Sequence, residues 1–140
     1  MESHASVAEM VFSYSEQAVK AAEGLSIKLD YSEGSVAELE SVVGKVTPSE
    51  GDDMAEACKM WGSYLGEVVR RRFSGAWSIE TYPGKQFATL TLSVGGSKIF
   101  PSMKVHRRLT QGESDNVWTF YKMVKARLEA SPQAGAALIQ

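Results

Sequence analysis

The chain has 140 residues, of which 44% are hydrophobic and 23% are charged, and its net charge is −2. This composition is typical of one ordinary globular domain, and the single Cys58 excludes an internal disulfide. No apolar run approaches the roughly 20 residues of a membrane span, and the acidic start at Glu2 does not resemble an export signal. We therefore expect a cytoplasmic protein with no membrane partner.

Charge is distributed unevenly along the chain. Residues 1–60 hold four Lys/Arg and twelve Asp/Glu, a net of −8, whereas residues 61–140 hold eleven and five, a net of +6. This asymmetry suggests either a charged partner or two halves that neutralise each other. The second interpretation is the simpler one, because acidic helices can pack around basic ones within one domain.

The spacing of apolar residues predicts a first helix over residues 4–23, which Gly24 should end. Residues 25–29 alternate between apolar and polar side chains and indicate a short extended link. Ser32 is then a suitable N-cap for a second helix that should end near Gly44. The inward-facing residues of this second helix are Val36, Leu39, Val43 and Val46.

A third, longer helix is predicted to be the central one. Ser49 and Asp52 match a capping box, so this helix should begin directly after Pro48. Its wide apolar stripe predicts contacts on more than one side. The stripe comprises Met54, Cys58, Trp61, Leu65 and Val68, widened by Ala57, Tyr64 and Val69, and it continues to Phe73. Gly62 and Gly66 each cost about 1 kcal/mol of helix propensity relative to Ala, so we expect a neighbouring backbone to approach closely there.

After the third helix, the apolar residues no longer follow a helical spacing but alternate with polar residues. This pattern predicts three antiparallel strands. Residues 77–81 and 88–94 alternate between apolar and polar side chains. The dipeptide Gly95-Gly96 suits a tight hairpin, after which residues 98–105 are expected to return as a third strand. Pro101 interrupts that strand and predicts an edge position or a bulge.

The remaining residues predict a last helix and a tail. Ser114 or Asp115 is expected to cap a helix whose inner stripe is Val117, Tyr121, Val124 and Leu128. The predicted fold class is therefore α+β: three N-terminal helices, a three-stranded antiparallel β-meander and a C-terminal helix. One domain is expected over residues 1–131, with residues 132–140 as a loosely tethered C-terminal tail.

Three consecutive arginines, Arg70, Arg71 and Arg72, fall in the last turn of the third helix. Cations there interact favourably with the helix dipole, by about 0.3–1 kcal/mol each, so the run needs no ligand to explain it. Arg72 falls on the side of the apolar stripe and must therefore reach past the core or meet an acidic partner. Glu67 precedes the run and can pair with Arg70 or Arg71.

A second basic group follows in the expected third strand. In a strand, Lys104, His106 and Arg108 would share one face. Together with Arg70 and Arg71 they form a candidate surface for binding an anionic ligand or partner. Nucleic acid is not favoured as that ligand, because the chain is acidic overall and contains no recognised nucleic-acid-binding motif.

The sequence contains no signature of catalysis or of a bound cofactor. Neither His4 nor His106 has a sequence-local nucleophile and carboxylate, so no catalytic residue is predicted. Two histidines and one cysteine, widely separated, do not have metal-ligand spacing. Glycine pairs occur only at the hairpin and do not precede a helix, so no phosphate-binding loop is predicted either.

Three segments stand in a recognisable order. They are Tyr64-Leu65-Gly66-Glu67, then Gly75-Ala76-Trp77, and later Phe100-Pro101-Ser102-Met103-Lys104-Val105. With the upstream Leu29-Asp30-Tyr31-Ser32, they resemble a group of small uncharacterised bacterial domains in which a YLGE helix leads into a G-x-W strand and a later FP-x-x-K-V segment. The resemblance spans about residues 29–128. It implies a bacterial origin and an α+β domain, and it implies no activity.

The sequence favours a non-enzymatic bacterial cytosolic protein-interaction module. A toxin-neutralising immunity protein is the most specific form of this hypothesis, because such proteins block a partner by electrostatic and shape complementarity. The alternative is a small-ligand or anion-binding domain that uses Glu67, the arginine run and the segment from Lys104 to Arg108. The partner is expected to be another protein, and the sequence does not indicate an oligomeric state.

Overall fold

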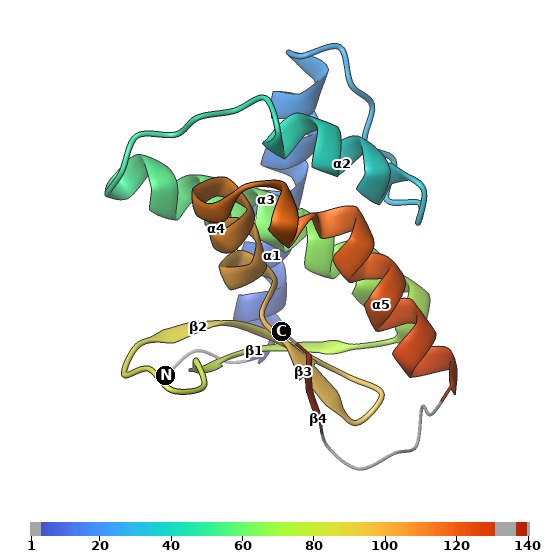
Figure 1. Cartoon of the computed structure of the whole chain (residues 1–140). Helices are drawn as coiled ribbons and strands as arrows, with labels where there is room; N and C mark the ends of the chain where they lie inside the picture. Colours follow the sequence, from blue (N-terminus) through green and yellow to red (C-terminus); the bar gives the residue numbers. More distant parts are fainter. Residues whose placement is uncertain (1–3, 131–136, 140) are drawn as a thin grey trace.

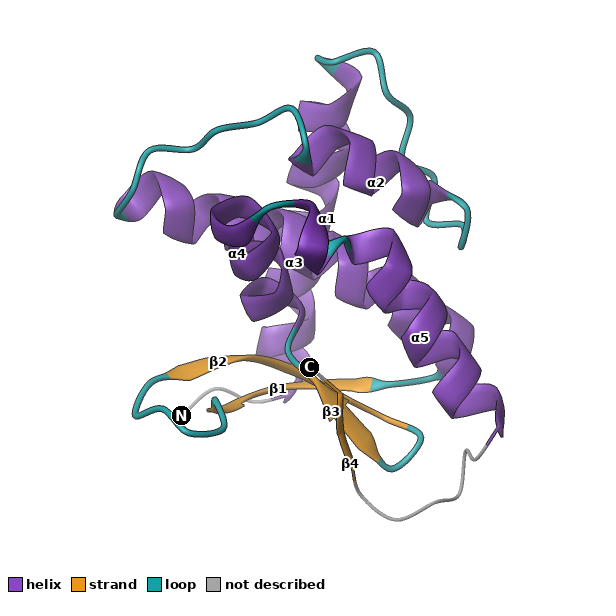
Figure 2. Cartoon of the chain, viewed as in Figure 1, coloured by secondary structure: helices purple, strands orange, loops and turns teal. Residues whose placement is uncertain are grey.

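The helices lie on one side of a small sheet in an α+β arrangement (Figures 1 and 2). The computed structural model describes residues 4–130 and 137–139. Its helices and strands, in chain order, are α1 (His4–Glu23), α2 (Ser35–Val43), α3 (Asp52–Phe73), β1 (Ala76–Thr81), β2 (Ala88–Val94), β3 (Ser97–Ile99), α4 (Pro101–Gln111), the 3₁₀ turn η1 (Glu113–Asp115), α5 (Val117–Ala130) and β4 (Ala137–Ile139). The predicted fold class is therefore confirmed in its coarse form, with an additional helix after the strands.

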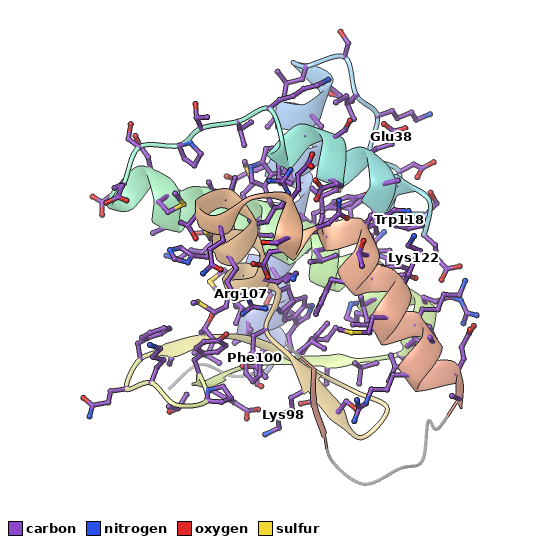
Figure 3. All side chains as sticks on the ribbon, viewed as in Figure 1. Glu38, Lys98, Phe100, Arg107, Trp118 and Lys122 are labelled. Carbon is purple, nitrogen blue, oxygen red and sulfur yellow. The ribbon has the colours of Figure 1, made fainter. Side chains whose placement is uncertain are left out.

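The sheet has the order β1-β2-β3-β4, in which β1, β2 and β3 form the predicted antiparallel meander. Trp77 pairs with Leu92, which pairs with Ile99, and all three side chains are buried. On the opposite side of the sheet, Lys98 forms an ion pair with Glu80, and Figure 3 shows Lys98 pointing away from the helices. The alternation of apolar and polar residues therefore gives the sheet one buried and one polar face.

The end of the chain contributes one more strand. β4 runs parallel to β3, with Ser97 in register with Ala137. Residues 131–136 and 140, which belong to the expected tail, lie outside the described residues. The pairing of residues 137–139 with the sheet was not anticipated from the sequence.

α3 occupies the centre of the helical layer, as its wide apolar stripe predicted. It contacts α1, α2, α4 and β2. Its middle turns are buried on all sides, and the buried residues are Cys58, Trp61, Gly62, Ser63, Tyr64, Leu65, Gly66, Glu67, Val68 and Val69. Neighbouring elements can approach α3 closely at Gly62 and Gly66, because glycine has no side chain.

The two glycines of α3 allow close approach by different groups. At Gly62, a Cβ atom would lie 2.6 Å from the Cα atom of Ser102, so the backbone of α4 touches α3 as expected. At Gly66, a Cβ atom would overlap the indole ring of Trp77 and lie 3.0 Å from a side-chain carbon of Pro101. The approach at Gly66 therefore comes from side chains, not from the predicted backbone.

The predicted third strand is wrong beyond Ile99. β3 ends there, and the residues from Pro101 to Gln111 form α4. Pro101 occupies the first turn of this helix, where its fixed φ angle is favourable and its missing N–H is not needed. The buried residues of α4 follow a helical period, and they are Pro101, Ser102, Lys104, Val105 and Arg108.

Three helix starts also differ from the predictions. α2 begins at Ser35 with Gly34 as its N-cap, in place of the predicted Ser32. α3 begins after Gly51, at Asp52, and no side-chain cap is present, so the capping box of Ser49 and Asp52 does not form. α5 begins after Asn116, whose Oδ1 accepts the N–H of Thr119, whereas the predicted caps belong to the preceding 3₁₀ turn. In all three segments the sequence offers more than one residue with a capping side chain, so the pattern alone does not select the start.

Candidate functional site

Glu67 is a buried carboxylate at the end of α3, and it has four donors around it. Arg70 donates from Nε to Oε2 at 2.6 Å and from Nη2 to Oε1 at 3.0 Å. Trp77 Nε1 donates to Oε2 at 2.8 Å, and Arg71 Nε donates to Oε1 at 3.3 Å. Burial would raise the pKa of Glu67, but the hydrogen bonds from Arg70 and Trp77 and the nearby positive charges outweigh it and hold the pKa below its usual value.

Arg71 extends this cluster toward the front half of the chain. Its guanidinium lies 3.6 Å from the centroid of the Tyr31 ring, a cation–π contact. The Tyr31 hydroxyl donates to Glu16 of α1 at 2.6 Å, and the Tyr31 backbone N–H donates to the hydroxyl of Tyr64 at 2.7 Å. Burial and the hydrogen bond to Glu16 raise the pKa of Tyr31, so this hydroxyl remains a donor.

Arg72 meets acidic partners, one of the two possibilities that its position predicted. It pairs with Glu129 of α5 at 3.2 Å and with Glu33, which precedes α2, at 3.6 Å. Glu33 also pairs with Lys125 at 3.1 Å and accepts a hydrogen bond from the hydroxyl of Tyr121. The three arginines therefore pair with acids of α3 itself, of α5 and of the segment before α2.

Lys104 and Arg108 lie one turn apart on α4 and are buried. Lys104 Nζ lies 2.9 Å from Oδ1 of Asp115, and Arg108 Nη2 lies 2.7 Å from Oε2 of Glu40. Glu40 Oε1 also accepts the backbone N–H of Val117 at 2.9 Å. The expected common strand face of residues 104, 106 and 108 does not exist, because this segment is helical.

His106 lies apart from both groups of ion pairs. It lines a pocket of about 500 Å³ between α3, α4 and the residues that lead into β2, which we call the α3–α4 pocket. Among the described residues, no ion pair joins the Glu67 cluster to Lys104 or Arg108. The structure thus distributes the predicted site residues over three places, and the pocket itself was missed because its walls come from distant parts of the sequence.

Ion pairs within the chain occupy most cations of the back half. Of its eleven Lys and Arg residues, those with a carboxylate within 4.0 Å are Arg70, Arg71, Arg72, Lys98, Lys104, Arg107, Arg108 and Lys125. In contrast, several acids of the front half are exposed and have no polar side-chain partner in the described ranges: Glu9, Glu23, Glu38, Glu50, Asp52 and Asp53. The described residues also include exposed cations without a carboxylate within 4.0 Å, namely Lys20, Lys28, Lys45, Lys85, Lys122 and Arg127. The cations of the back half are thus mostly paired within the chain, whereas half of the acids of the front half are exposed and unpaired.

Neither a metal-binding cluster nor a membrane-spanning helix is present among the described residues. Across residues 4–130 and 137–139, no three His, Cys, Asp or Glu side chains gather closely enough to hold a metal ion. Within the same ranges, none of the helices has the length and apolar character that crossing a membrane requires.

Comparisons with protein-family models, curated proteins and solved structures find no match to this chain. The resemblance to small bacterial domains stays a prediction.

Proposed function

We propose that this chain is a non-enzymatic protein-interaction module of the bacterial cytosol whose binding surface is acidic. The observation that supports this proposal is the difference in ion pairing between the cations of the back half and the acids of the front half. Ion pairs within the chain occupy most cations of the back half and leave acids of the front half exposed. A toxin-neutralising immunity protein is the most specific function with this requirement, since it must recognise one charged partner.

The partner is expected to be basic. The predicted basic surface offers little to an anionic partner, because Lys104 and Arg108 are buried beside their own carboxylates. Exposed acids attract a basic protein over several ångströms and raise the rate of association, and salt weakens that attraction. Binding of the natural partner should therefore become slower as ionic strength rises.

The exposed acids come from separate elements of the front half. Glu9 and Glu23 belong to α1, and Figure 3 shows Glu38 on α2, at the end of the molecule opposite to the sheet. Asp52 and Asp53 form the first turn of α3, which projects beyond α4 in Figure 1, and Glu50 precedes it. These acids offer a partner several anionic contacts without disturbing the core.

The experiment uses a variant in which Glu50→Gln, Asp52→Asn and Asp53→Asn are combined. Wild type and variant are used to capture proteins from a lysate of the source organism at low and high salt. Each captured protein is then purified, and its association rate with both forms is measured. We expect a basic partner whose association with the variant is slower, by about two- to five-fold for each acid that it contacts.

A matched control removes three exposed positive charges that have no carboxylate within 4.0 Å among the described residues. Lys20→Gln, Lys45→Gln and Lys122→Gln change exposed cations of α1, of the link after α2 and of α5. This control should bind the basic partner at least as fast as wild type. A partner whose binding is the same with both variants and at both salt concentrations would contradict the acidic interface.

A further inference from the structure

We propose that the α3–α4 pocket binds a small amphipathic carboxylate, an organic acid with an apolar body and one anionic head. This site is separate from the acidic surface of the proposed function and has the opposite charge preference. The pocket volume of about 500 Å³ is within the range of small-molecule sites. Its walls come from the first turns of α3, from α4 and from the residues that lead into β2.

The floor and walls of the pocket are apolar. Cys58 of α3 is buried, and Met103 of α4 is half-buried. Phe87, which is 45% exposed, forms part of the opposite wall and stacks on Tyr82 with ring centroids 5.8 Å apart. An apolar ligand body that covers Phe87 and Met103 removes this area from water, which favours binding by roughly 25 cal/mol per Å² before the costs of association.

The charged side chains around the pocket determine which charge on a ligand is favoured. Apart from the Cys58 thiol, its ionisable side chains are Lys59, Lys85 and His106, and no carboxylate lines it. Lys59 lies 3.4 Å from Glu56, but this pair is exposed and screened by water. Lys85 has no carboxylate within 4.0 Å among the described residues. A carboxylate head is therefore favoured in this pocket, whereas an ammonium head is repelled.

The position of a neighbouring acid orients the ligand. A smaller hollow of about 280 Å³ shares Ala55 and His106 with the pocket, and Glu50 lines its far side. A carboxylate head placed toward Glu50 would be repelled. The head is therefore expected beside Lys85, with the apolar body extending toward Cys58.

Ser102 of α4 forms part of the pocket wall, but its hydroxyl lies between α4 and α3. Ser102 is 6% exposed and lines the pocket. Its Oγ has no hydrogen-bond partner in the part of the chain that the structure describes. A Cβ atom on Gly62 would lie 2.9 Å from this oxygen, so the hydroxyl faces α3 and is not accessible to a ligand in the pocket.

The experiment compares three probes that share one tail: octanoate, octanol and octylammonium. Binding to the full chain is measured by isothermal titration calorimetry and by backbone amide shifts in NMR spectra. We expect octanoate to bind more tightly than octanol and octanol more tightly than octylammonium, with shifts at Cys58, Phe87 and Met103. Equal or tighter binding of octylammonium would overturn the proposal, as would the absence of saturable octanoate binding.

Two variants test the head and the tail separately. Lys85→Gln removes an exposed cation and is expected to weaken octanoate by about two- to five-fold while leaving octanol unchanged. Lys20→Gln, an exposed lysine on α1, is the matched control and should affect neither probe. Ala55→Leu adds volume to the pocket wall on an exposed helical position and should weaken both octanoate and octanol.

The outcomes separate this site from the acidic interface. If Lys85→Gln behaves like Lys20→Gln toward octanoate, or if Ala55→Leu leaves octanoate affinity unchanged, the ligand is elsewhere and the proposal fails. The variant with Glu50→Gln, Asp52→Asn and Asp53→Asn should retain octanoate binding. Loss of partner binding in that variant with retained octanoate binding would support both proposals independently.

Discussion

Glu40 and Arg108 are 68 residues apart in the sequence, and their side chains form an ion pair of 2.7 Å. The pair joins α2 to α4, and the same carboxylate accepts the first N–H of α5 from Val117. One acid of the front half thus connects three helices. Both side chains are largely buried, with 9% of Arg108 and 15% of Glu40 exposed, so solvent does not replace the contact easily.

Replacing this acid should destabilise the fold. Glu40→Gln leaves Arg108 buried without a countercharge, and we expect a loss of about 2–3 kcal/mol, somewhat less than for a fully buried pair. Urea denaturation at neutral pH measures it. Glu38→Gln, an exposed change on the same helix, should alter the free energy of unfolding by less than about 0.5 kcal/mol. A similar small effect of both variants would show that the Glu40 contact adds no stability.

A methyl group at Gly66 should be poorly tolerated. The Trp77 ring occupies the space that the methyl group would need, and the indole N–H of Trp77 donates to Glu67. Gly66→Ala must therefore displace a buried indole. We expect destabilisation by about 1–3 kcal/mol, as for other overpacked cores, together with a shift in tryptophan fluorescence. Gly34→Ala provides the comparison, because no atom lies within 4 Å of its added Cβ. It should change stability by less than about 1 kcal/mol.

Cys58 should react slowly in the native protein. Burial raises the pKa of its thiol from 9.0 to about 11, so the reactive thiolate is about 100-fold less populated near neutral pH. The rate of thiol labelling should therefore rise with pH through the alkaline range and approach its normal value only after denaturation. Native labelling as fast as in denaturant would contradict the burial of this residue. Octanoate in the α3–α4 pocket should slow the native reaction further, because Cys58 lines that pocket.

Acid should destabilise the protein through its paired carboxylates. The hydrogen bond from Lys104 outweighs partial burial and, with the charge of Arg107, lowers the pKa of Asp115. Its stabilising contribution is present above the unfolded pKa of about 3.9 and is lost as the pH falls through the lower folded value. The free energy of unfolding should therefore decrease below about pH 5.

Substitution at Asp115 measures how much this carboxylate contributes to the loss of stability at low pH. Asp115→Asn should lower stability at pH 7 and make the dependence on pH below about 5 less steep than in wild type. Asp53→Asn removes an exposed carboxylate without a described partner and is measured beside it as the control. Parallel urea denaturation curves at several pH values make the comparison. Identical pH profiles for Asp115→Asn and wild type would remove Asp115 from this account.

Local sequence patterns predicted the elements that depend on periodicity. The first helix has the predicted bounds, and the apolar stripe around Trp61 and Leu65 predicted the central position of α3. The main error concerns Pro101, which interrupts a strand pattern but also suits the first turn of a helix. The short segment after Ile99 contains too few apolar residues to distinguish the period of a strand from that of a helix. The close packing of this segment against Gly62 of α3 is not visible in the local sequence.

The candidate site was less accessible to prediction. Pairing of Glu67 with Arg70 and Arg71 follows from helical spacing and was expected. The partner of Arg108 could not be found in this way, because Glu40 becomes its neighbour only when α2 and α4 pack together. The predicted basic surface requires an exposed Lys104, whereas Lys104 is 7% exposed and pairs with Asp115. The α3–α4 pocket likewise requires three separate segments to meet.

The pairing between the two halves has a consequence for synthesis on the ribosome. Translation makes the acidic half first, so Glu33 and Glu40 are synthesised before their partners Arg72, Arg108 and Lys125. Until those cations follow, the nascent helices lack the countercharges that hold them together. A chain interrupted before residue 108 would expose Glu40 to solvent and leave α2 without its ion pair to α4. The order of synthesis therefore delays completion of the helical layer until the basic half has emerged.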